Sequence, residues 1–220
     1  MERTVKRLLI FALVSASCGL PLVYLLHVAQ SKRVQRGHSR VTASPARIVF
    51  FGDSITANWN LDQRFPGMHL VNRGAAADTT SKMASRFESD VVALRPKIVV
   101  ILGGVNDIRR DISVEVTEAN LEFMVRLAKD HEIEVILSSL LPLSEGQAPG
   151  TASPKSAQVQ RLNTWLEAYA RSEGCIYADY YSALANERGG FNAQLTDDGI
   201  HPNAAGYRVM DSVVQQVLRK

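Results

Sequence analysis

The sequence predicts an α/β protein, in which a mainly parallel five-stranded sheet lies between two layers of helices as a three-layer αβα sandwich. Short apolar runs rich in β-branched residues alternate with longer amphipathic segments over about 170 residues, and this alternation is typical of parallel sheets. Several apolar runs are continuous, which indicates strands covered on both faces. Since no internal repeat is visible, the pattern predicts a single folded domain.

The strands and helices are predicted from the spacing of apolar residues. Short runs bounded by polar or turn residues are expected to be strands, and segments with apolar residues three or four positions apart are expected to be helices. Asp78 is a candidate cap for the first long helix. The predicted strands are Ile48–Phe51, Leu70–Asn72, Ile98–Leu102, Val135–Ser138 and Cys175–Ala178, and the predicted helices are Thr79–Leu94, Ser113–Asp130, Ser156–Ser172 and Ala204–Leu218.

The chain divides into a leader, a linker and one domain. Its 220 residues are long enough for one well-buried domain and too short for two comfortable ones. Residues 1–30 are predicted to be a membrane anchor or signal segment containing a hydrophobic helix. Residues 31–45, which are polar and basic, are expected to be a tether. Residues 46–220 then form the folded domain.

The leader is favoured as an uncleaved anchor that holds the domain outside the cytoplasm. From Leu8 to Ala29 there are 22 residues without a formal charge, preceded by three basic residues, and such a run can span a hydrocarbon core of ~30 Å. Its apolar character continues past Ser17, where a signal peptide would be cut. Secretion after cleavage is the alternative, and a lipoprotein signal through Cys18 is a weaker one.

The charge distribution argues against a nucleic-acid partner. Although the formal net charge is +3, residues 1–40 carry seven Lys or Arg and one acidic residue, which leaves 18 basic and 21 acidic residues in the rest of the chain. A nucleic-acid-binding domain should concentrate positive charge on its folded part. We therefore expect no nucleic-acid partner. The charge distribution is compatible with a small-molecule, carbohydrate or lipid partner, and we expect contact with a membrane through the leader.

Metal and cofactor sites are not expected. The two cysteines are isolated, and the sequence has neither a CxxC nor an HExxH motif. It also lacks a P-loop and a GxGxxG motif, which argues against nucleotide binding. The sequence therefore predicts chemistry performed by side chains alone.

Several polar phrases are predicted to meet at one edge of the sheet. Ser54 follows the first strand, Gly74 the second and Asn106 the third. In parallel α/β sheets the ligand crevice lies outside the carboxyl ends of the strands, so we expect these residues to line it.

Ser54, His201 and Asp198 are candidates for a catalytic triad. A serine hydroxyl becomes a useful nucleophile when a neighbouring base takes its proton and a third group orients that base. Asp198 lies three residues before His201 and can accept the ring Nδ1–H, which leaves Nε2 for Ser54. Asp197 is the neighbouring candidate. The structural alternatives are a helix cap for Ser54 or His201 and a turn for Asp198.

Asn106 and Gly74 are candidates for an oxyanion hole. The Asn106 side chain can donate an N–H to a developing oxyanion, with the backbone N–H groups of Gly74 and Ser54 donating alongside it. An asparagine in a glycine-rich loop and a glycine after Asn-Arg are also common in ordinary turns.

Four phrases in this order resemble the sequence blocks of the SGNH, or GDSL-type, esterase/lipase superfamily. The resemblance covers about residues 46–218, and the chain looks most similar to bacterial relatives of platelet-activating-factor acetylhydrolase subunits and carbohydrate acetylesterases. It departs from the pattern at Ile55, where leucine is usual, and at Ala77, where a second glycine is common; alanine would be strained there if φ is positive. The phrases are Gly52-Asp53-Ser54-Ile55, Asn72-Arg73-Gly74, Gly104-Val105-Asn106-Asp107 and Asp198-Gly199-Ile200-His201-Pro202.

The resemblance implies a flavodoxin-like SGNH hydrolase fold and a serine esterase without metal or cofactor. It implies Ser54 as nucleophile, His201 as base, Asp198 as its orienting group, and Ser54, Gly74 and Asn106 as oxyanion donors. We expect a short, acetyl-type acyl group, since no long apolar insertion suggests a lid for lipids. Trp59 is a candidate for substrate binding, with a place in the core as the alternative. Lysophospholipase, thioesterase or acyltransferase activity at the same site, and a non-catalytic membrane-tethered binding module, are the other hypotheses.

Overall fold

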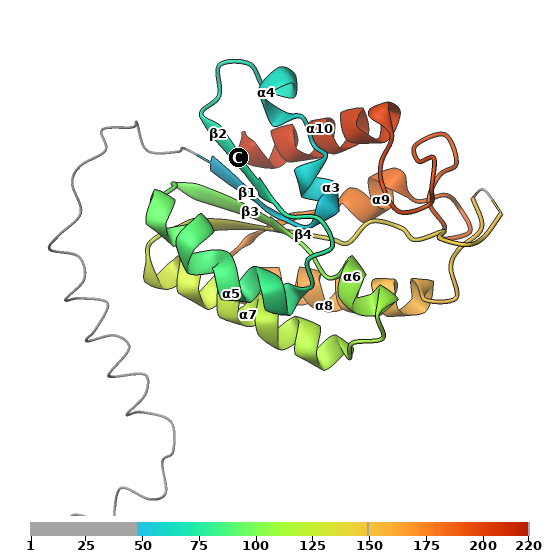
Figure 1. The fold of residues 1–220 in the computed structure, drawn as a ribbon, viewed down its shortest axis with the longest axis horizontal. Coiled ribbons are helices and arrows are strands. Elements are labelled where there is room, and N and C mark those ends of the chain that lie inside the picture. Colours follow the sequence, from blue (N-terminus) through green and yellow to red (C-terminus); the bar gives the residue numbers. More distant parts are fainter. Residues whose placement is uncertain (1–47, 149, 220) are drawn as a thin grey trace, which may run out of the picture. The chain divides into compact units, whose positions relative to one another are not determined.

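The computed structural model describes residues 48–148 and 150–219, which form the three-layer αβα architecture that the sequence predicts (Figure 1). Five strands make one sheet in the order β2-β1-β3-β4-β5, and every neighbouring pair is parallel. The register aligns Gly52 at the end of β1 with Gly74 of β2 and with Leu102 of β3. The carboxyl ends of the first three strands therefore meet at one edge.

The strands lie where the apolar runs predict them. The predicted bounds of β3 are unchanged. Strands β1, β2 and β4 are one or two residues longer than predicted, because their ladders extend to flanking polar residues or glycines, whereas β5 is one residue shorter, because its pairing with β4 begins at Ile176 and not at Cys175. The strands are β1 (Ile48–Gly52), β2 (Leu70–Gly74), β3 (Ile98–Leu102), β4 (Glu134–Ser138) and β5 (Ile176–Ala178).

The long helices cover both faces of the sheet. Figure 1 shows α5 (Thr80–Asp90), α7 (Val114–Asp130) and α8 (Ser156–Ser172) on one face, and α10 (Ala204–Leu218) on the other. The predicted bounds of α8 and α10 are confirmed. The short helices are α3 (Ser54–Ala57), α4 (Leu61–Arg64), α6 (Val105–Arg109) and α9 (Tyr180–Leu184).

The first long helix differs from its prediction at both ends. Thr79 is the N-cap of α5, without a side-chain capping bond, whereas Asp78 forms an ion pair of 2.7 Å with Arg86. The prediction of Asp78 as the cap is therefore wrong, because its carboxylate pairs with Arg86, eight residues farther along the chain. The helix also ends at Asp90, and residues Val92–Leu94 form a separate 3-10 turn.

The core fills the space between the sheet and both helical layers. The side chains of β1 are buried along its whole length, as expected for a strand with helices above and below it. Phe50 packs edge-on against Trp59, with ring centroids 5.3 Å apart, and Trp59 packs in the same way against Tyr180 at 6.0 Å. Burial of such rings supplies much of the stabilisation of a domain of this size.

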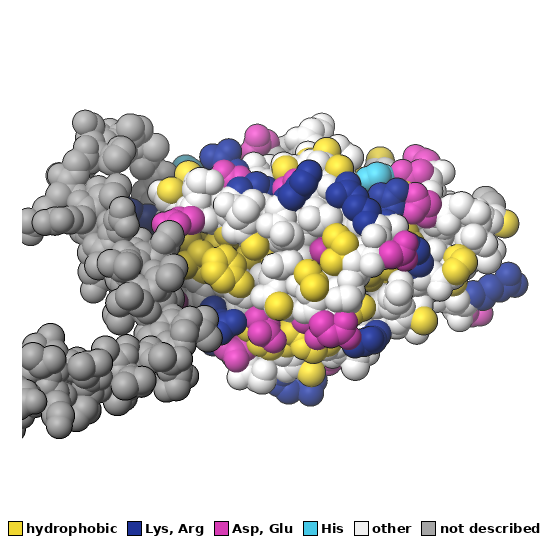
Figure 2. Space-filling model, turned by 60° about the horizontal axis from the view of Figure 1, so that its bottom comes forward, with side chains coloured by type: hydrophobic (Ala, Val, Ile, Leu, Met, Phe, Trp, Pro, Cys, Tyr) yellow, Lys and Arg dark blue, Asp and Glu magenta, His cyan; other side chains and the backbone are white. Residues whose placement is uncertain are grey.

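The surface of the domain mixes charges of both signs. In the face shown in Figure 2, Lys and Arg side chains alternate with Asp and Glu side chains and with small apolar areas. Surface ion pairs link α7 to the residues around α8, for example Arg161 to Glu115 and Lys129 to Glu173. A mixed surface of this kind keeps a domain soluble without attracting a polyanion.

The predicted membrane anchor and tether are not among the described residues. Residues 1–30, predicted as the anchor, and 31–45, predicted as the tether, lie outside the described residues. Within residues 48–148 and 150–219, no helix combines the length and the apolarity that crossing a bilayer requires.

Candidate active site

Ser54 is the first residue of α3, at the turn that follows β1. The N-cap of this helix is Asp53, whose Oδ1 accepts the backbone N–H of Ile55 at 2.9 Å. The capping role considered for Ser54 is thus filled by its neighbour. The turn is tight, because a Cβ built on Gly52 would lie 2.3 Å from the carbonyl oxygen of Leu102. Glycine is therefore required directly before Asp53 and Ser54.

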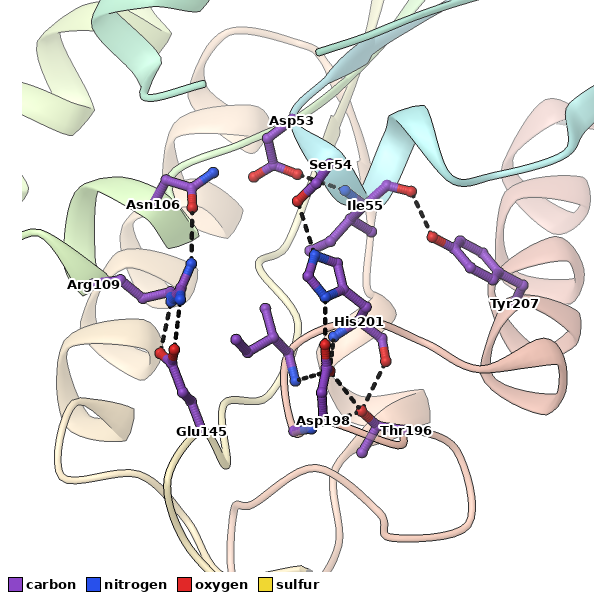
Figure 3. A network of polar contacts seen from close by, with 12 residues as sticks. Asp53, Ser54, Ile55, Asn106, Arg109, Glu145, Thr196, Asp198, His201 and Tyr207 are labelled. Atoms are coloured by element: carbon purple, nitrogen blue, oxygen red, sulfur yellow. Dashed lines mark hydrogen bonds and ion pairs between the residues drawn. The ribbon is translucent and has the colours of Figure 1, made fainter. Parts of the chain in front are cut away.

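His201 and Asp198 lie beside Ser54 in the order that proton transfer requires (Figure 3). The Ser54 Oγ is 2.9 Å from His201 Nε2, and His201 Nδ1 is 2.6 Å from Asp198 Oδ2. With Nδ1 donating to the carboxylate, Nε2 is free to accept the serine proton. Asp197 contacts Asn203 instead, at 3.3 Å, so the spacing argument for Asp198 agrees with the geometry.

The loop that carries His201 is fixed by its own hydrogen bonds. The Thr196 hydroxyl donates to the carbonyl oxygen of His201 at 2.7 Å, and the backbone N–H of His201 donates to Asp198 Oδ1 at 2.7 Å. Asn203 caps the N-terminus of α10, so His201 is not the cap that the sequence left as an alternative. The imidazole is therefore held before a substrate arrives.

Hydrogen bonds keep Asp198 ionised. Partial burial would raise the pKa of this carboxyl, but hydrogen bonds from the His201 ring and from the backbone N–H groups of His201 and Ile200 lower it to about 2. Hydrogen bonds to the charged form stabilise it relative to the protonated form. Asp198 is thus a carboxylate throughout the pH range in which proteins normally work.

Asn106 is the second residue of α6, shortly after the Gly103-Gly104 pair that follows β3. It is 3% exposed, and its Nδ2 donates to the carbonyl oxygen of Asp78 at 2.9 Å. An amide nitrogen has a second hydrogen, and Figure 3 shows the Nδ2 end of Asn106 facing Asp53 and Ser54. The structure therefore brings Asn106 to the place that the sequence predicts.

Gly74 does not present its N–H to the site. This N–H donates to Asn72 Oδ1 at 2.8 Å. A Cβ on Gly74 would lie 2.1 Å from the backbone nitrogen of Ala57, so the glycine lets α3 pack against the end of β2. The predicted oxyanion role for Gly74 is corrected here, because both its N–H and its missing side chain have structural functions.

Ala77 has the positive φ under which, as the sequence analysis noted, an alanine is strained. Its φ is 62°, a conformation that costs a residue with a side chain of order 1 kcal/mol. Within residues 48–148 and 150–219, the Ala77 N–H has no hydrogen-bond acceptor. The next residue, Asp78, accepts the amide of Asn106. The strained turn thus lies beside Asn106 and carries an N–H without a partner.

Trp59 lies in the core, which is the alternative that the sequence left open. It is 2% exposed, and its Nε1 donates to Asp211 of α10 at 2.8 Å. It also borders a groove of about 550 Å³ lined by residues 57–62 and 70–72. Since Ser54, His201 and Asp198 do not line this groove, we assign it no part in the chemistry.

Several polar residues near the site were not singled out by the sequence. Asp107 accepts the backbone N–H and the hydroxyl of Thr80 and thereby satisfies the start of α5. Arg109 forms an ion pair with Glu145 and also contacts Asn106. The spacing of Asn106 and Arg109, one helical turn apart, was a usable signal, whereas Glu145 is 36 residues farther along the chain.

Metal binding has no support in the described part of the chain. Among residues 48–148 and 150–219, no three His, Cys, Asp or Glu side chains are grouped so that they could hold a metal ion.

The comparisons with known proteins agree with this geometry. Residues 50–209 match the model of the GDSL-like Lipase/Acylhydrolase family. A solved structure of a GDSL-like lipase from Bacteroides thetaiotaomicron superposes with a TM-score of 0.73 and 29% identity, over 88% of this chain and 96% of that one.

Curated relatives include two esterases. Esterase TesA of Pseudomonas aeruginosa is 26% identical over 78% of this chain and 87% of its own length, and an acetylxylan esterase of Geobacillus stearothermophilus is 26% identical over 66% and 69%. The uncharacterized lipoprotein YqeF of Bacillus subtilis is 28% identical over 45% of this chain, and the match spans half of that relative's length. With well over half of the chain matched by the family model, the protein belongs to the GDSL-like Lipase/Acylhydrolase family and is a carboxylic ester hydrolase.

Proposed function

We propose that the protein hydrolyses short-chain carboxylic esters through Ser54, His201 and Asp198. The observation that carries the proposal is the continuous chain of contacts from Ser54 Oγ to His201 Nε2, 2.9 Å, and from His201 Nδ1 to Asp198 Oδ2, 2.6 Å. These three groups come from two loops 147 residues apart. If Ser54 or His201 were only a helix cap, or Asp198 only part of a turn, nothing would require the three side chains to be in contact.

The reaction proceeds in two steps. His201 Nε2 takes the proton of Ser54 while Oγ attacks the acyl carbon, and the imidazolium is stabilised by the Asp198 carboxylate. His201 then gives this proton to the leaving alcohol, which breaks the ester bond and leaves an acyl group on Ser54. In the second step His201 takes a proton from water, whose oxygen attacks the acyl carbon. The bond between the acyl carbon and Ser54 Oγ then breaks, and His201 returns the proton to Oγ, which releases the carboxylic acid and restores Ser54.

The oxyanion formed in each step would be bound by Ser54, Ala77 and Asn106. The Ser54 N–H is at the first position of α3, where a helix provides no acceptor. Ala77 replaces Gly74 as the second backbone donor, since its N–H is unpaired among the described residues and its turn adjoins Asn106. The second hydrogen of Asn106 Nδ2 is the third donor. Fixed donors of this kind stabilise the transition state without reorganising.

A short acyl group is proposed from a relative and not from a cavity. The void beneath the Ser54 turn, which borders Asp53, Ile55 and Leu102, has no room even for a water molecule, so we assign no acyl pocket to it. The relative that is named an acetylxylan esterase supports an acetyl-type group. An acetyl group needs little more than a methyl-sized pocket.

A series of p-nitrophenyl esters tests the acyl preference. We expect kcat/KM for the acetate to exceed that for the decanoate by about tenfold or more, because each methylene that a small pocket cannot hold costs ~1–3 kcal/mol. Initial rates for the acetate, butyrate, octanoate and decanoate with the purified full chain measure this ratio, and Ser54→Ala gives the background. A decanoate rate equal to the acetate rate would contradict the short-acyl proposal and favour a lipid ester.

We also propose that residues 1–30 anchor the domain outside the cytoplasm. The relative named a lipoprotein supports attachment to a membrane, and the uncharged run from Leu8 to Ala29 is long enough to span one. Protease added to intact cells should digest the domain while a cytoplasmic marker survives. Protection of the domain until the cells are lysed would contradict this location.

A further inference from the structure

Arg109 connects Asn106 to the loop that follows β4. It lies at the end of α6, one helical turn after Asn106. Its Nη1 donates to Asn106 Oδ1 at 3.2 Å, while its Nε and Nη2 donate to the two carboxylate oxygens of Glu145 at 2.6 and 2.5 Å (Figure 3). All three nitrogens of the guanidinium group therefore have partners.

Glu145 is itself held beside the loop of the candidate triad. The backbone N–H of the preceding residue, Ser144, donates to the carbonyl oxygen of Gly199 at 2.9 Å. Gly199 has a φ of 77°, and a Cβ there would lie 2.7 Å from the backbone of Ser144. Contacts thus run from Asn106 through Arg109 and Glu145 to the segment that carries Asp198 and His201.

Arg109 and the carbonyl oxygen of Asp78 together determine which end of the Asn106 amide faces Ser54. The guanidinium group of Arg109 can only donate, and within the Asn106 amide only Oδ1 can accept. The contact with Nη1 therefore keeps Oδ1 toward Arg109 and Nδ2 toward the nucleophile. The reversed amide would place an oxygen lone pair against the developing oxyanion. Hydrogen bonds in a chain also polarise one another, so a cation on Oδ1 makes the Nδ2 hydrogens better donors.

We infer that Arg109, fixed by Glu145, is a positioning residue that aims and polarises the Asn106 amide in the oxyanion hole. This inference rests on the proposed function, because it assigns Arg109 an effect only through Asn106. The paired charges also explain why an arginine is tolerated at the rim of the site, since Glu145 neutralises it and keeps it from binding the substrate itself.

The neighbouring arginine supports the other side of the hole. Arg110 Nη2 donates to the carbonyl oxygen of Ala77 at 3.0 Å, and Ala77 supplies the proposed backbone donor. Arg110 is exposed, so its contact is screened and competes with water. We expect Arg110→Ala to lower kcat by only about twofold to threefold.

The test is the effect of Arg109 variants on kcat and KM for p-nitrophenyl acetate. We expect Arg109→Ala to lower kcat by about tenfold to thirtyfold, a fraction of the 10²–10³ lost with a whole donor, and to change KM by less than about twofold. Arg109→Lys keeps the charge without the two parallel bonds and should fall in between. Arg161→Ala, which breaks the exposed ion pair with Glu115 at 2.5 Å, is the matched control and should keep wild-type kcat.

A double-mutant cycle separates positioning from a merely structural role. In an Asn106→Ala background, Arg109→Ala should lower kcat by less than about twofold more, because its target is gone. A full tenfold loss from Arg109→Ala in that background would overturn the inference. So would an Arg109→Ala protein with raised KM and unchanged kcat, or one whose kcat equals that of the Arg161→Ala control. Melting temperatures of all variants show whether a loss is due to unfolding, in which case Arg109→Lys decides.

The failure of the proposed function gives a different result. If the wild-type chain hydrolyses no ester and Ser54 is inert, the assignment of the site fails before Arg109 is considered. If wild type is active, only the comparison of Arg109 variants bears on the inference.

Discussion

Replacing Ser54 by alanine is expected to lower kcat for p-nitrophenyl acetate by about 10⁴- to 10⁶-fold, because no other group takes over the attack on the acyl carbon. The hydroxyl contacts His201 at 2.9 Å and is partly buried, so its removal leaves little space unfilled. The fold should therefore survive, and the residual rate should come from oxyanion binding alone.

The matched control for this variant is Ser85→Ala. Ser85 is an exposed serine on α5, and its hydroxyl donates to the carbonyl oxygen of Lys82 at 2.7 Å. Both variants lose one hydroxyl and one hydrogen bond, but only Ser54 lies beside the imidazole. Burst kinetics and steady-state rates of the two proteins measure the difference, and equal rates would refute the proposed nucleophile.

Replacing Asp53 by asparagine is expected to stabilise the protein increasingly as the pH rises from about 4 to 7. Asp53 is fully buried, and burial raises its pKa from 3.8 to about 6. Its Oδ2 has no partner among the described residues. Because the folded-state pKa is raised, the stability of the wild-type protein is full below pH 3.8 and declines as the pH rises through 6. The difference of about two pH units corresponds to about 3 kcal/mol.

Asparagine keeps the capping oxygen but carries no charge. The free energy of unfolding of Asp53→Asn minus that of wild type should therefore grow by about 3 kcal/mol between pH 4 and pH 7. Urea unfolding followed by tryptophan fluorescence at several pH values measures it, with the exposed Asp62→Asn as the control. If this difference in unfolding free energy stays constant with pH, ionisation of Asp53 does not destabilise the folded protein, and the prediction is wrong.

The fold could be predicted from sequence where the apolar pattern is long or continuous. Helices Ser156–Ser172 and Ala204–Leu218 and strand Ile98–Leu102 agree with their predicted bounds. The short helices, such as α3 with four residues and α6 with five, were missed because about one turn contains no period to detect. The capping role of Asp78 was wrong because its ion pair with Arg86 depends on tertiary structure.

Spacing within the chain carries the information for one contact of the candidate site. The three-residue separation of Asp198 and His201 allows the contact that the structure shows. The proposed backbone donor moves from Gly74, at the end of β2, to Ala77, in the turn that follows, because a sequence does not show which N–H is already bonded. Gly74 is needed for contact with α3, while Ala77 adopts the positive φ expected of a glycine.

The long-range contacts of Arg109 and Arg110 could not have been found in the sequence. Arg109 and Glu145 are 36 residues apart, and only the folded loop after β4 brings them together. The same is true of Arg110 and Ala77, which are 33 residues apart. Local patterns therefore predict the candidate reacting groups, whereas the contacts that orient those groups depend on the fold.

Covalent labelling by a fluorophosphonate tests the central assignment most directly. The probe reacts with a serine only where a base and an oxyanion hole activate it. Peptide mass analysis of the labelled full chain should find the adduct on Ser54, and loss of labelling should accompany Ser54→Ala but not Ser85→Ala. Retained labelling of Ser54→Ala, or ester hydrolysis by a wild-type chain whose Ser54 stays unmodified, would contradict the assignment.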